Sequence, residues 1–321
     1  MEKTNNKKRN VLIAMAILSI ILVYSLSSCM GRLARVGTSV PQEQAKPERS
    51  FAIININGTI QASPDTAFTQ VSYDHNKIMA YIDELIKDDN NFGILLKVNS
   101  GGGTVYHSDE MYSKLMEYKE KTGRPVHAYF KEVAASGAYY ISCAADYISA
   151  NKNCWTGSIG VIISYTNLKG LYDKLGMEEI IISSGTNKGM GSAAQVLTKE
   201  QRDIYQGLVD ESYDNFVNIV AQGRKIDKEK VIQLADGRVY TASQALENKL
   251  IDKVETWQEA LDGMTELTGV EGYEKNLMSN GSYLSYLIGE YKSATPKSDM
   301  QAVEEMLSKD LNGVPLYYYQ R

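Results

Sequence analysis

The sequence is poor in cysteine and histidine, and this shortage argues against several kinds of site. Each residue type occurs three times in 321 residues. Cys29, Cys143 and Cys154 form no CxxC pair and no Cys/His cluster with the spacing of metal ligands. We therefore expect no metal site and no cofactor. Lone cysteines in apolar runs are usually buried thiols, so we expect Cys143 and Cys154 in the core, with a disulfide between them as the alternative.

The chain also lacks an excess of positive charge. It has 34 Lys and Arg residues against 39 Asp and Glu residues, a net charge of −5. No basic cluster interrupts the body of the chain, and the GxxxxGK[ST] pattern of a phosphate-binding loop is absent. We therefore expect no nucleic acid partner. The hydrophobic and charged fractions, 43% and 23%, are those of an ordinary globular protein.

The N-terminus carries the signals of a membrane segment. Residues 1–10 form a basic flank, and residues 11–30 contain no charged side chain. Because basic flanks stay in the cytoplasm, we expect a single anchor with the folded body on the extracytoplasmic side. A length of about 20 apolar residues favours an uncleaved helix. The alternative is a lipoprotein signal, since "LSSC" resembles a bacterial lipobox in which Cys29 would be lipidated.

The rest of the chain divides into a linker, a body and a tail. Residues 31–50 are polar and contain two prolines, which is typical of a linker. The globular body is expected over 51–271. The segment 272–321 holds seven of the 22 tyrosines, and we expect a helix over 299–311 and an extended end.

The body alternates between apolar runs and helical patterns. This alternation predicts an α/β architecture with parallel strands and an active site at their carboxyl ends, where "SGGG" and the turn at Ser136 fall. One helix is expected to start near Ser108 as its N-cap. The expected strands are 51–60, 92–100, 125–134, 147–151, 158–165 and 178–184, and the other expected helices are 74–87, 166–176 and 198–224.

Ser136, in "KEVAASGAYYIS", is either a nucleophile or a small residue in close packing. A nucleophilic serine needs a base. His107 is the one histidine in a suitable position, but no Asp is evident to orient it. Lys188 is the other candidate: its loop has no acidic residue between Ile180 and Lys199. A lysine serves as a base only when its amine is neutral, which burial favours; otherwise it is an ordinary surface lysine.

Five motifs in order carry a resemblance that covers residues 51–260: "NSGGGTVYHSDEM", "AASGAYYIS", "TGSIGV", "SSGTNKGMGSA" and "DGRVYTASQALENKLID". With them the chain resembles the signal peptide peptidase A family of bacterial membrane-anchored serine peptidases. The resemblance implies a Clp-protease/crotonase-like fold and a Ser-Lys dyad. By motif, Ser136 is similar to the nucleophile, Lys188 to the base, Ser158 to the serine that positions the lysine, and Gly103 and Gly137 to the oxyanion donors.

The sequence departs from the family pattern at a few positions. Gly101 stands where the family usually has proline, and Ala138 where glycine is common; Lys249 also replaces a common glycine. The first change makes the turn before Gly102 less rigid, because glycine restricts the backbone less than proline. None of the changes removes a proposed catalytic group.

The resemblance also implies an endopeptidase at the bacterial cell membrane that hydrolyses signal peptides and other unfolded chains. Family members assemble into homo-oligomeric rings or domes with a shared binding groove. The end of the tail, "VPLYYYQR", resembles a peptide that such a groove could hold, so we expect it as a ligand of a neighbouring subunit. The alternatives are a crotonase-like acyl-CoA enzyme and a catalytically silent oligomeric membrane scaffold.

Overall fold

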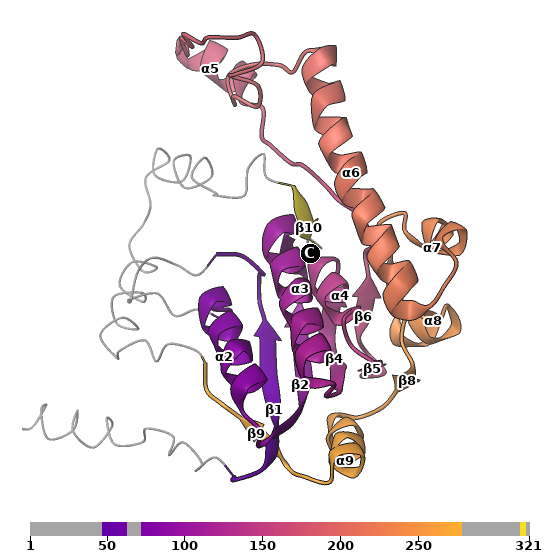
Figure 1. Cartoon of the computed structure of the whole chain (residues 1–321). Helices are drawn as coiled ribbons and strands as arrows, with labels where there is room; N and C mark the ends of the chain where they lie inside the picture. The colour runs from indigo at the N-terminus through magenta and orange to yellow at the C-terminus, as the bar shows by residue number, and fades with distance from the viewer. Residues whose placement is uncertain (1–46, 63–71, 278–314, 319–321) are drawn as a thin grey trace, which may run out of the picture. The chain divides into compact units, whose positions relative to one another are not determined.

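The computed structural model describes residues 47–62, 72–277 and 315–318. Within these ranges one sheet runs in the order β7-β6-β4-β2-β1-β9 (Figure 1), with β5 paired to β4 and β8 paired to β5. The expected anchor at 11–30, Cys29 and the helix at 299–311 lie outside the described residues. Inside the described part, no helix is both long enough and apolar enough to cross a membrane.

The centre of the sheet is parallel, as predicted. β1 (Ser50–Asn57), β2 (Asn91–Ser100) and β4 (Val126–Ala135) pair in parallel, and both β5 (Tyr147–Ala150) and β6 (Trp155–Gly157) run parallel to β4. The margins are shorter strands: β7 (Val239–Thr241), antiparallel to β6, β8 (Lys253–Val254), and β9 (Gly272–Glu274), parallel to β1. The sheet thus extends past residue 271 into the tyrosine-rich segment.

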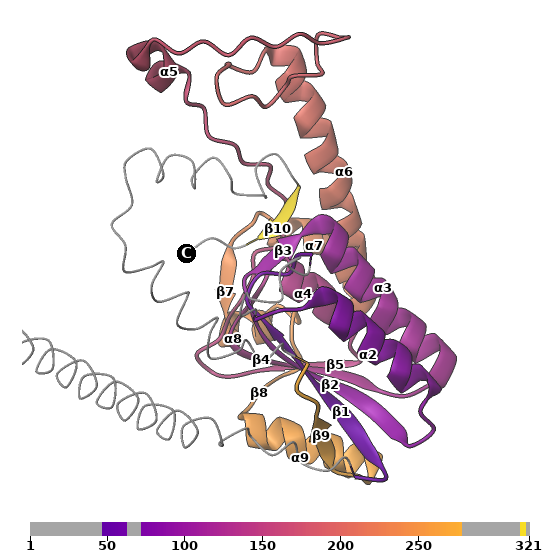
Figure 2. The same ribbon diagram turned by 90° about the vertical axis from the view of Figure 1, so that its left-hand side faces the viewer.

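Helices cover both faces of the sheet (Figure 2). Alternate residues of β1 point to opposite faces: Ile54 and Ile56 join the larger core, whereas Phe51 and Ile53 join a smaller one. The larger core packs against α2 (His75–Lys87), α3 (Val105–Thr122) and α4 (Gly137–Ser142). The smaller core packs against α9 (Trp257–Thr268). The sheet is therefore the middle layer of three.

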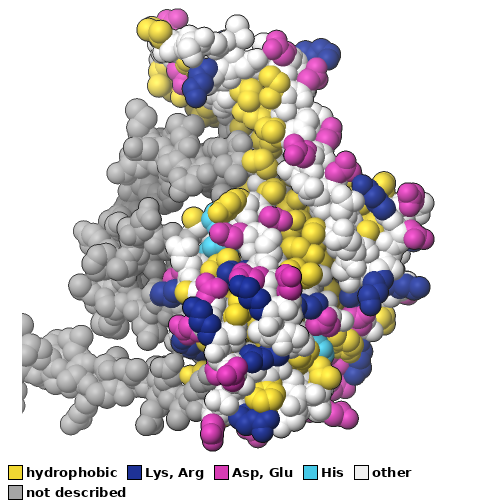
Figure 3. All heavy atoms as spheres, viewed as in Figure 1, with side chains coloured by type: hydrophobic (Ala, Val, Ile, Leu, Met, Phe, Trp, Pro, Cys, Tyr) yellow, Lys and Arg dark blue, Asp and Glu magenta, His cyan; other side chains and the backbone are white. Residues whose placement is uncertain are grey.

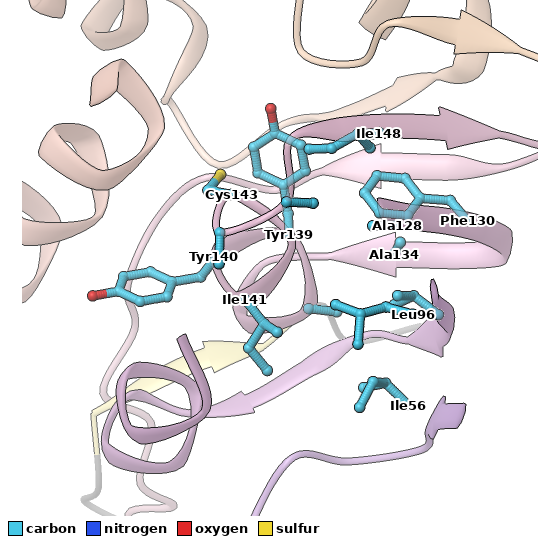
Figure 4. Close-up of a cluster of buried hydrophobic side chains, with 14 of the residues drawn as sticks. Ile56, Leu96, Ala128, Phe130, Ala134, Tyr139, Tyr140, Ile141, Cys143 and Ile148 are labelled. Atoms are coloured by element: carbon cyan, nitrogen blue, oxygen red, sulfur yellow. The ribbon is translucent and has the colours of Figure 1, made fainter. Parts of the chain in front are cut away.

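The larger core is filled around α4. Figure 4 shows Tyr139, Tyr140 and Ile141 of this helix among side chains from β1, β2, β4 and β5. Cys143 lies in the same cluster, and both Cys143 and Cys154 are buried free thiols. This confirms the expected core cysteines and rejects the disulfide.

One predicted helix start was wrong. The helix α3 begins at Val105, four residues after Gly101, with Thr104 as its N-cap, because the Thr104 hydroxyl accepts a hydrogen bond from the His107 backbone N–H. Ser108, the predicted N-cap, is fully buried one turn later, and its hydroxyl donates to the Thr104 carbonyl. The hydroxyl of Thr104, four residues before Ser108, is the one that caps the helix.

The region between β6 and the long helix α6 (Lys199–Arg224) differs most from prediction. The predicted helix 166–176 is present as α5 (Lys169–Leu175), and α6 begins after Thr198 as predicted. The predicted strands 158–165 and 178–184 were wrong: the first contributes a single bridge at Ile162, and the second has no strand pairing. Its apolar side chains are exposed, Ile182 by 97%.

Two short helices complete the layer behind β6 and β7. α7 (Lys228–Leu234) buries Val231 and Leu234, and α8 (Ala242–Glu247) begins with a capping box at Thr241. The C-terminal part of α6 also enters the core through Phe216, Val217 and Val220. α6, α7 and α8 thus add buried side chains to the larger core on the side of β6 and β7.

A second, two-stranded sheet lies beyond the end of β2. Its strands are β3 (Gly102–Thr104) and β10 (Leu316–Tyr318), which pair antiparallel. The described end of the chain therefore lies against the glycine turn singled out in the sequence.

Candidate active site

Ser136 lies at the sharp turn between β4 and α4. Its backbone angles, φ 55° and ψ −119°, are rarely adopted by residues other than glycine and cost on the order of 1–3 kcal/mol. The turn is fixed by two hydrogen bonds, from the Ser136 N–H to the Gly157 carbonyl and from the Tyr140 N–H to the Ser136 carbonyl. The Ser136 hydroxyl does not cap α4. The strained backbone therefore holds the Ser136 hydroxyl at the turn without using it as a helix cap.

Ser158 lies beside Ser136. The parallel register of β4 and β6 pairs Ala135 with Gly157, so that the two serines follow on adjacent strands. Ser158 also has a positive φ, 49°, and its N–H donates to the Arg238 carbonyl. Both serines line one cavity of about 420 Å³. The structure thus brings these two predicted residues together.

Gly103 and Gly137 are held back to back next to Ser136. A Cβ built on Gly137 would meet the Gly103 nitrogen at 3.1 Å. Gly102 has a φ of 98°, and a Cβ there would collide with the Gly137 nitrogen. Only glycine fits at these positions. The backbone nitrogens of Gly103 and Gly137 therefore lie close to each other next to Ser136, and an oxyanion hole needs two such donors near the nucleophile.

The described end of the chain occupies the groove over these glycines. β10 lies between β3, where Tyr317 pairs with Gly103, and Ile162, which exchanges two backbone hydrogen bonds with Leu316 of 3.1 and 2.9 Å. The Tyr317 carbonyl oxygen is close to Gly102 and Gly137, since a Cβ on either would contact it. An extended segment paired in this way is held by main-chain hydrogen bonds, which is how a peptide binds by adding a strand to a sheet edge.

Tyr317 fills an aromatic pocket and is 1% exposed. Its ring stacks on Tyr140 with centroids 4.9 Å apart and also contacts Phe216 at 4.7 Å. Its hydroxyl donates to the Ser212 carbonyl at 2.7 Å. The hydroxyl of Tyr140 in turn donates to Asp109 at 2.6 Å. The pocket beside Ser136 therefore accepts an aromatic ring and has an acceptor for its hydroxyl.

Lys188 is exposed, and the structure does not bring it to Ser136. It lies in the loop between α5 and α6, which Figures 1 and 2 place at the N-terminal end of α6 and away from α4. The Lys188 N–H donates to the Gly185 carbonyl, and the neighbouring Asn187 amide donates to Glu200. Within the described ranges, the ammonium has no hydrogen bond or ion pair. The sequence analysis required a buried Lys188 amine, but Lys188 is exposed in the described part of the single chain.

His107, the alternative base, is engaged elsewhere. Its Nδ1 is 2.6 Å from the Thr104 hydroxyl, and its ring packs edge-on against His75. It does not line the cavity of Ser136 and Ser158. Asp109, two residues on, accepts from Tyr140 instead. The geometry therefore does not support a Ser-His-Asp arrangement.

Several residues of the site were missed by sequence reasoning. The cavity of Ser136 is also lined by residues of α6 and of the turn before β7, including Tyr213 and Asp236. Arg238 binds the Asp236 carboxylate and lowers its pKa to about 2. Tyr213 and Asp236 are far from Ser136 in the sequence, and no local pattern marks them as its neighbours. Among the described residues, no group of three or more His, Cys, Asp or Glu could hold a metal ion.

Comparisons with known proteins identify a family of peptidases. Peptidase family S49 matches residues 118–271. A protein of Enterococcus faecium that carries the name signal peptide peptidase SppA is 35% identical over 286 residues, which cover 86% of this chain and 83% of the relative. Protease 4 of Haemophilus influenzae is 31% identical over 279 residues, 82% and 44% of the two chains. Serine protease SPPA of Arabidopsis thaliana chloroplasts is 33% identical over 161 residues, 50% and 24%. These names favour a peptidase over an acyl-CoA enzyme or a silent scaffold.

Proposed function

Because the chain belongs to the signal peptide peptidase A family of S49 serine peptidases, we propose that it is an endopeptidase with Ser136 as nucleophile and Lys188 as general base. The backbone of Ser136 is the observation that carries this. A non-glycine residue at φ 55° between a strand and a helix is costly, and such strain is concentrated at functional sites. The closeness of the Gly103 and Gly137 backbone nitrogens supports the same role.

The chemistry follows from these groups. The neutral Lys188 amine takes the proton of the Ser136 hydroxyl as its oxygen attacks a peptide carbonyl carbon. Gly103 and Gly137 donate hydrogen bonds to the resulting oxyanion. Lysine then returns the proton to the leaving amine, which gives an acyl-enzyme. A water that loses its proton to the same amine hydrolyses the ester, and the proton passes back to Ser136.

The Lys188 that serves a given Ser136 belongs to a neighbouring copy of the chain. The lysine loop is exposed in the single chain, and so are apolar side chains beside it: Ile180 is 78% exposed and Ile182 97%. Figure 3 shows further hydrophobic side chains along the first half of α6. Apolar patches of this kind mark protein interfaces. Covering the loop by assembly would remove water from the amine and favour its neutral form.

The substrates are extended peptides that bind as β10 does. A peptide placed between β3 and Ile162 would present every second side chain to the pocket that holds Tyr317. The tail is then a ligand of this groove, in its own chain or in a neighbour. Signal peptides, named for the Enterococcus relative, are suitable substrates because they are unfolded once released. Folded proteins lack the free strand that the groove requires.

The location proposed for this activity is the extracytoplasmic side of a bacterial cell membrane. The charge-free run at 11–30 after a basic flank supports a tether there. Two forms of tether are distinguished by the N-terminal peptide of the protein purified from membranes. Mass spectrometry that finds residue 1 or 2 at the N-terminus supports the uncleaved helix, whereas an acylated Cys29 at the N-terminus supports the lipoprotein.

The experiment that tests the function uses the full-length protein in detergent with a fluorogenic signal peptide. We expect Ser136→Ala and Lys188→Ala each to abolish cleavage while circular dichroism stays unchanged. Cleavage by folded Ser136→Ala would overturn the proposal. Cleavage by Lys188→Ala would remove only the lysine base. Because lysine must be neutral to act, the wild-type rate is expected to rise from pH 6 to pH 9.

Mixing the two inactive variants tests where the lysine comes from. In a shared site, a Lys188→Ala subunit supplies Ser136 and a Ser136→Ala subunit supplies Lys188. Random exchange in a ring then gives about a quarter of the wild-type activity, since one neighbour pair in four is complete. A mixture that stays inactive after subunit exchange, verified with labelled subunits, would contradict the shared site.

A further inference from the structure

A buried histidine, His75, lies near the start of α3, the helix that follows β3, and takes no part in the proposed chemistry. His75, the first residue of α2, is 2% exposed. Its Nδ1 is 2.7 Å from the Tyr73 hydroxyl, and its Nε2 is 2.8 Å from the Glu110 carboxylate. A carboxylate only accepts, so Nε2 carries a proton and donates it to Glu110. Both ring nitrogens are engaged, which fixes the orientation of the ring.

His107 packs on this fixed ring. The two imidazoles meet edge to face with centroids 4.8 Å apart, and the Tyr106 ring also contacts His107, with centroids 5.0 Å apart. The Nδ1 of His107 then lies 2.6 Å from the Thr104 hydroxyl oxygen. Glu110 and Tyr73 fix the His75 ring, and the packing of His107 against that ring helps to fix the position of the His107 Nδ1.

The direction of the bond between His107 and Thr104 follows from the helix cap. The Thr104 oxygen already accepts the His107 backbone N–H at 3.3 Å. Among the described residues, Nδ1 is the acceptor within reach of the hydroxyl proton. We therefore assign the Thr104 hydroxyl as the donor and Nδ1 as the acceptor, an assignment that requires a neutral ring with its proton on Nε2. Burial, with the nearby His75, lowers the pKa of the ring against the opposing effect of Glu110, and a cation at a helix N-terminus is unfavourable.

Thr104 connects this cluster to the oxyanion donors. Its N–H donates to the Ile60 carbonyl at 2.9 Å, and its own carbonyl accepts from Ser108. The Ser108 oxygen lies directly against Gly137, because a Cβ on that glycine would collide with it. Gly103, whose N–H is one of the two proposed donors, is the neighbour of Thr104 on β3. A shift of the Thr104 side chain would thus move both groups proposed to bind the oxyanion.

We propose that His107 is a positioning residue: it accepts the Thr104 hydroxyl proton and thereby holds β3 with the Gly103 N–H aimed at the reacting carbonyl. The inference rests on the proposed function of Ser136. It assigns a role in the reaction to a histidine that does not touch the substrate. The donors are needed most when the oxyanion forms, so His107 acts on the rate of the chemical step more than on substrate binding.

The test compares His107→Asn with His107→Gln in the full-length protein. The Asn amide oxygen reaches the place of Nδ1, whereas the Gln oxygen extends beyond it, and the two side chains are otherwise alike. We expect kcat to fall about tenfold in His107→Gln, with KM within twofold, and to recover in His107→Asn, because misplacing a donor costs less than the 10²–10³-fold of removing one. His127→Gln, on β4 against Tyr147, is the control and keeps wild-type kcat.

A peptide aldehyde gives a second readout. Its adduct with Ser136 carries an oxygen at the oxyanion position, so its inhibition constant should rise in His107→Gln in step with the loss of kcat. Equal kcat in the Asn and Gln variants, or an unchanged aldehyde constant, overturns the positioning role. Ser136→Ala is measured alongside: if it stays active, the proposed function fails, and if it is inactive while His107→Gln is normal, only the present inference fails. Thermal unfolding confirms that each variant is folded.

Discussion

Ala135 of β4 faces Gly157 of β6 in a parallel register, and this pairing sets Ser136 beside Ser158. Both serines have a positive φ, at 55° and 49°. Two adjacent strands are thus each followed by a serine with a positive φ, at the carboxyl edge where α/β folds place their ligands. This arrangement is compatible with the proposed role of the Ser158 hydroxyl in positioning the lysine amine.

Removing the Ser158 hydroxyl should slow catalysis without unfolding the chain. We expect Ser158→Gly to lose about tenfold or more in kcat, since placing a general base contributes on the order of 10²–10⁴-fold. Glycine adopts a φ of 49° without strain, so thermal stability should stay near that of wild type. Ser183→Ala, an exposed serine in the lysine loop, is the control. Full activity in Ser158→Gly would contradict the positioning of the amine.

Gly102 should tolerate no side chain. In Gly102→Ala the Cβ meets the Tyr317 carbonyl oxygen and the Gly137 nitrogen, at a φ of 98°. We expect activity to fall below a hundredth and the free energy of unfolding to drop by about 1–3 kcal/mol from backbone strain alone. The matched control is Gly207→Ala in α6, where nothing lies within 4 Å of the Cβ. That change should stabilise the protein by about 0.5–1 kcal/mol, because glycine is unfavourable inside a helix. Denaturant unfolding and peptide cleavage measure both.

Deleting residues 315–321 should free the groove. The deletion removes the strand that pairs with β3 and the ring that fills the pocket of Tyr140 and Phe216. We expect KM for a peptide substrate to fall severalfold while kcat stays constant. Tyr317→Phe, which loses only the hydrogen bond to Ser212 worth about 1 kcal/mol, should give a smaller decrease. An unchanged KM in the deletion would show that the tail does not compete with substrate.

The two core thiols should resist alkylation in the native protein. Burial raises the pKa of Cys143 and of Cys154 from an ordinary 9.0 to about 12. Iodoacetamide reacts with the thiolate, so peptide mapping after treatment at pH 8.5 should find both residues unmodified, and modified after urea. Rapid labelling of either in folded protein would contradict their burial.

The same thiols predict a loss of stability in alkali. A raised pKa in the folded state means that the unfolded chain loses its thiol protons first, near pH 9, which favours unfolding. Their contribution is complete below pH 9 and is lost between pH 9 and about 12. Cys143→Ala should therefore flatten the fall of the unfolding midpoint across this window, as followed by circular dichroism.

Local patterns predicted the centre of the fold. The alternation in β1 and the glycine turn after β2 are features of adjacent residues, and the structure has both elements close to the expected bounds. The turn from β4 into α4 at Ser136 was also foreseen, because small residues in sequence mark a close backbone approach. The positive φ of Ser136 was not predicted, because serine is not a residue type that favours this conformation.

Where tertiary contacts decide, the sequence was insufficient. The apolar run at 178–184 has the composition of a strand, yet it pairs with no strand in the described part of the chain and its isoleucines are exposed. β propensity describes a fit to a half-buried surface, and this chain alone provides none there. The same holds for Lys188: its loop composition suggested a buried amine, but burial depends on what covers the loop.

The strand β10 gives the groove an occupant in every copy of the chain. A ligand joined to its own site has an effective concentration on the order of millimolar, whatever the concentration of the protein. A free peptide with the same affinity as the tail must reach a higher concentration than this before it displaces β10 from the groove, and a peptide that binds more tightly needs proportionally less. The groove would then open only where peptides accumulate, and scattered extended segments of other proteins would be left uncut.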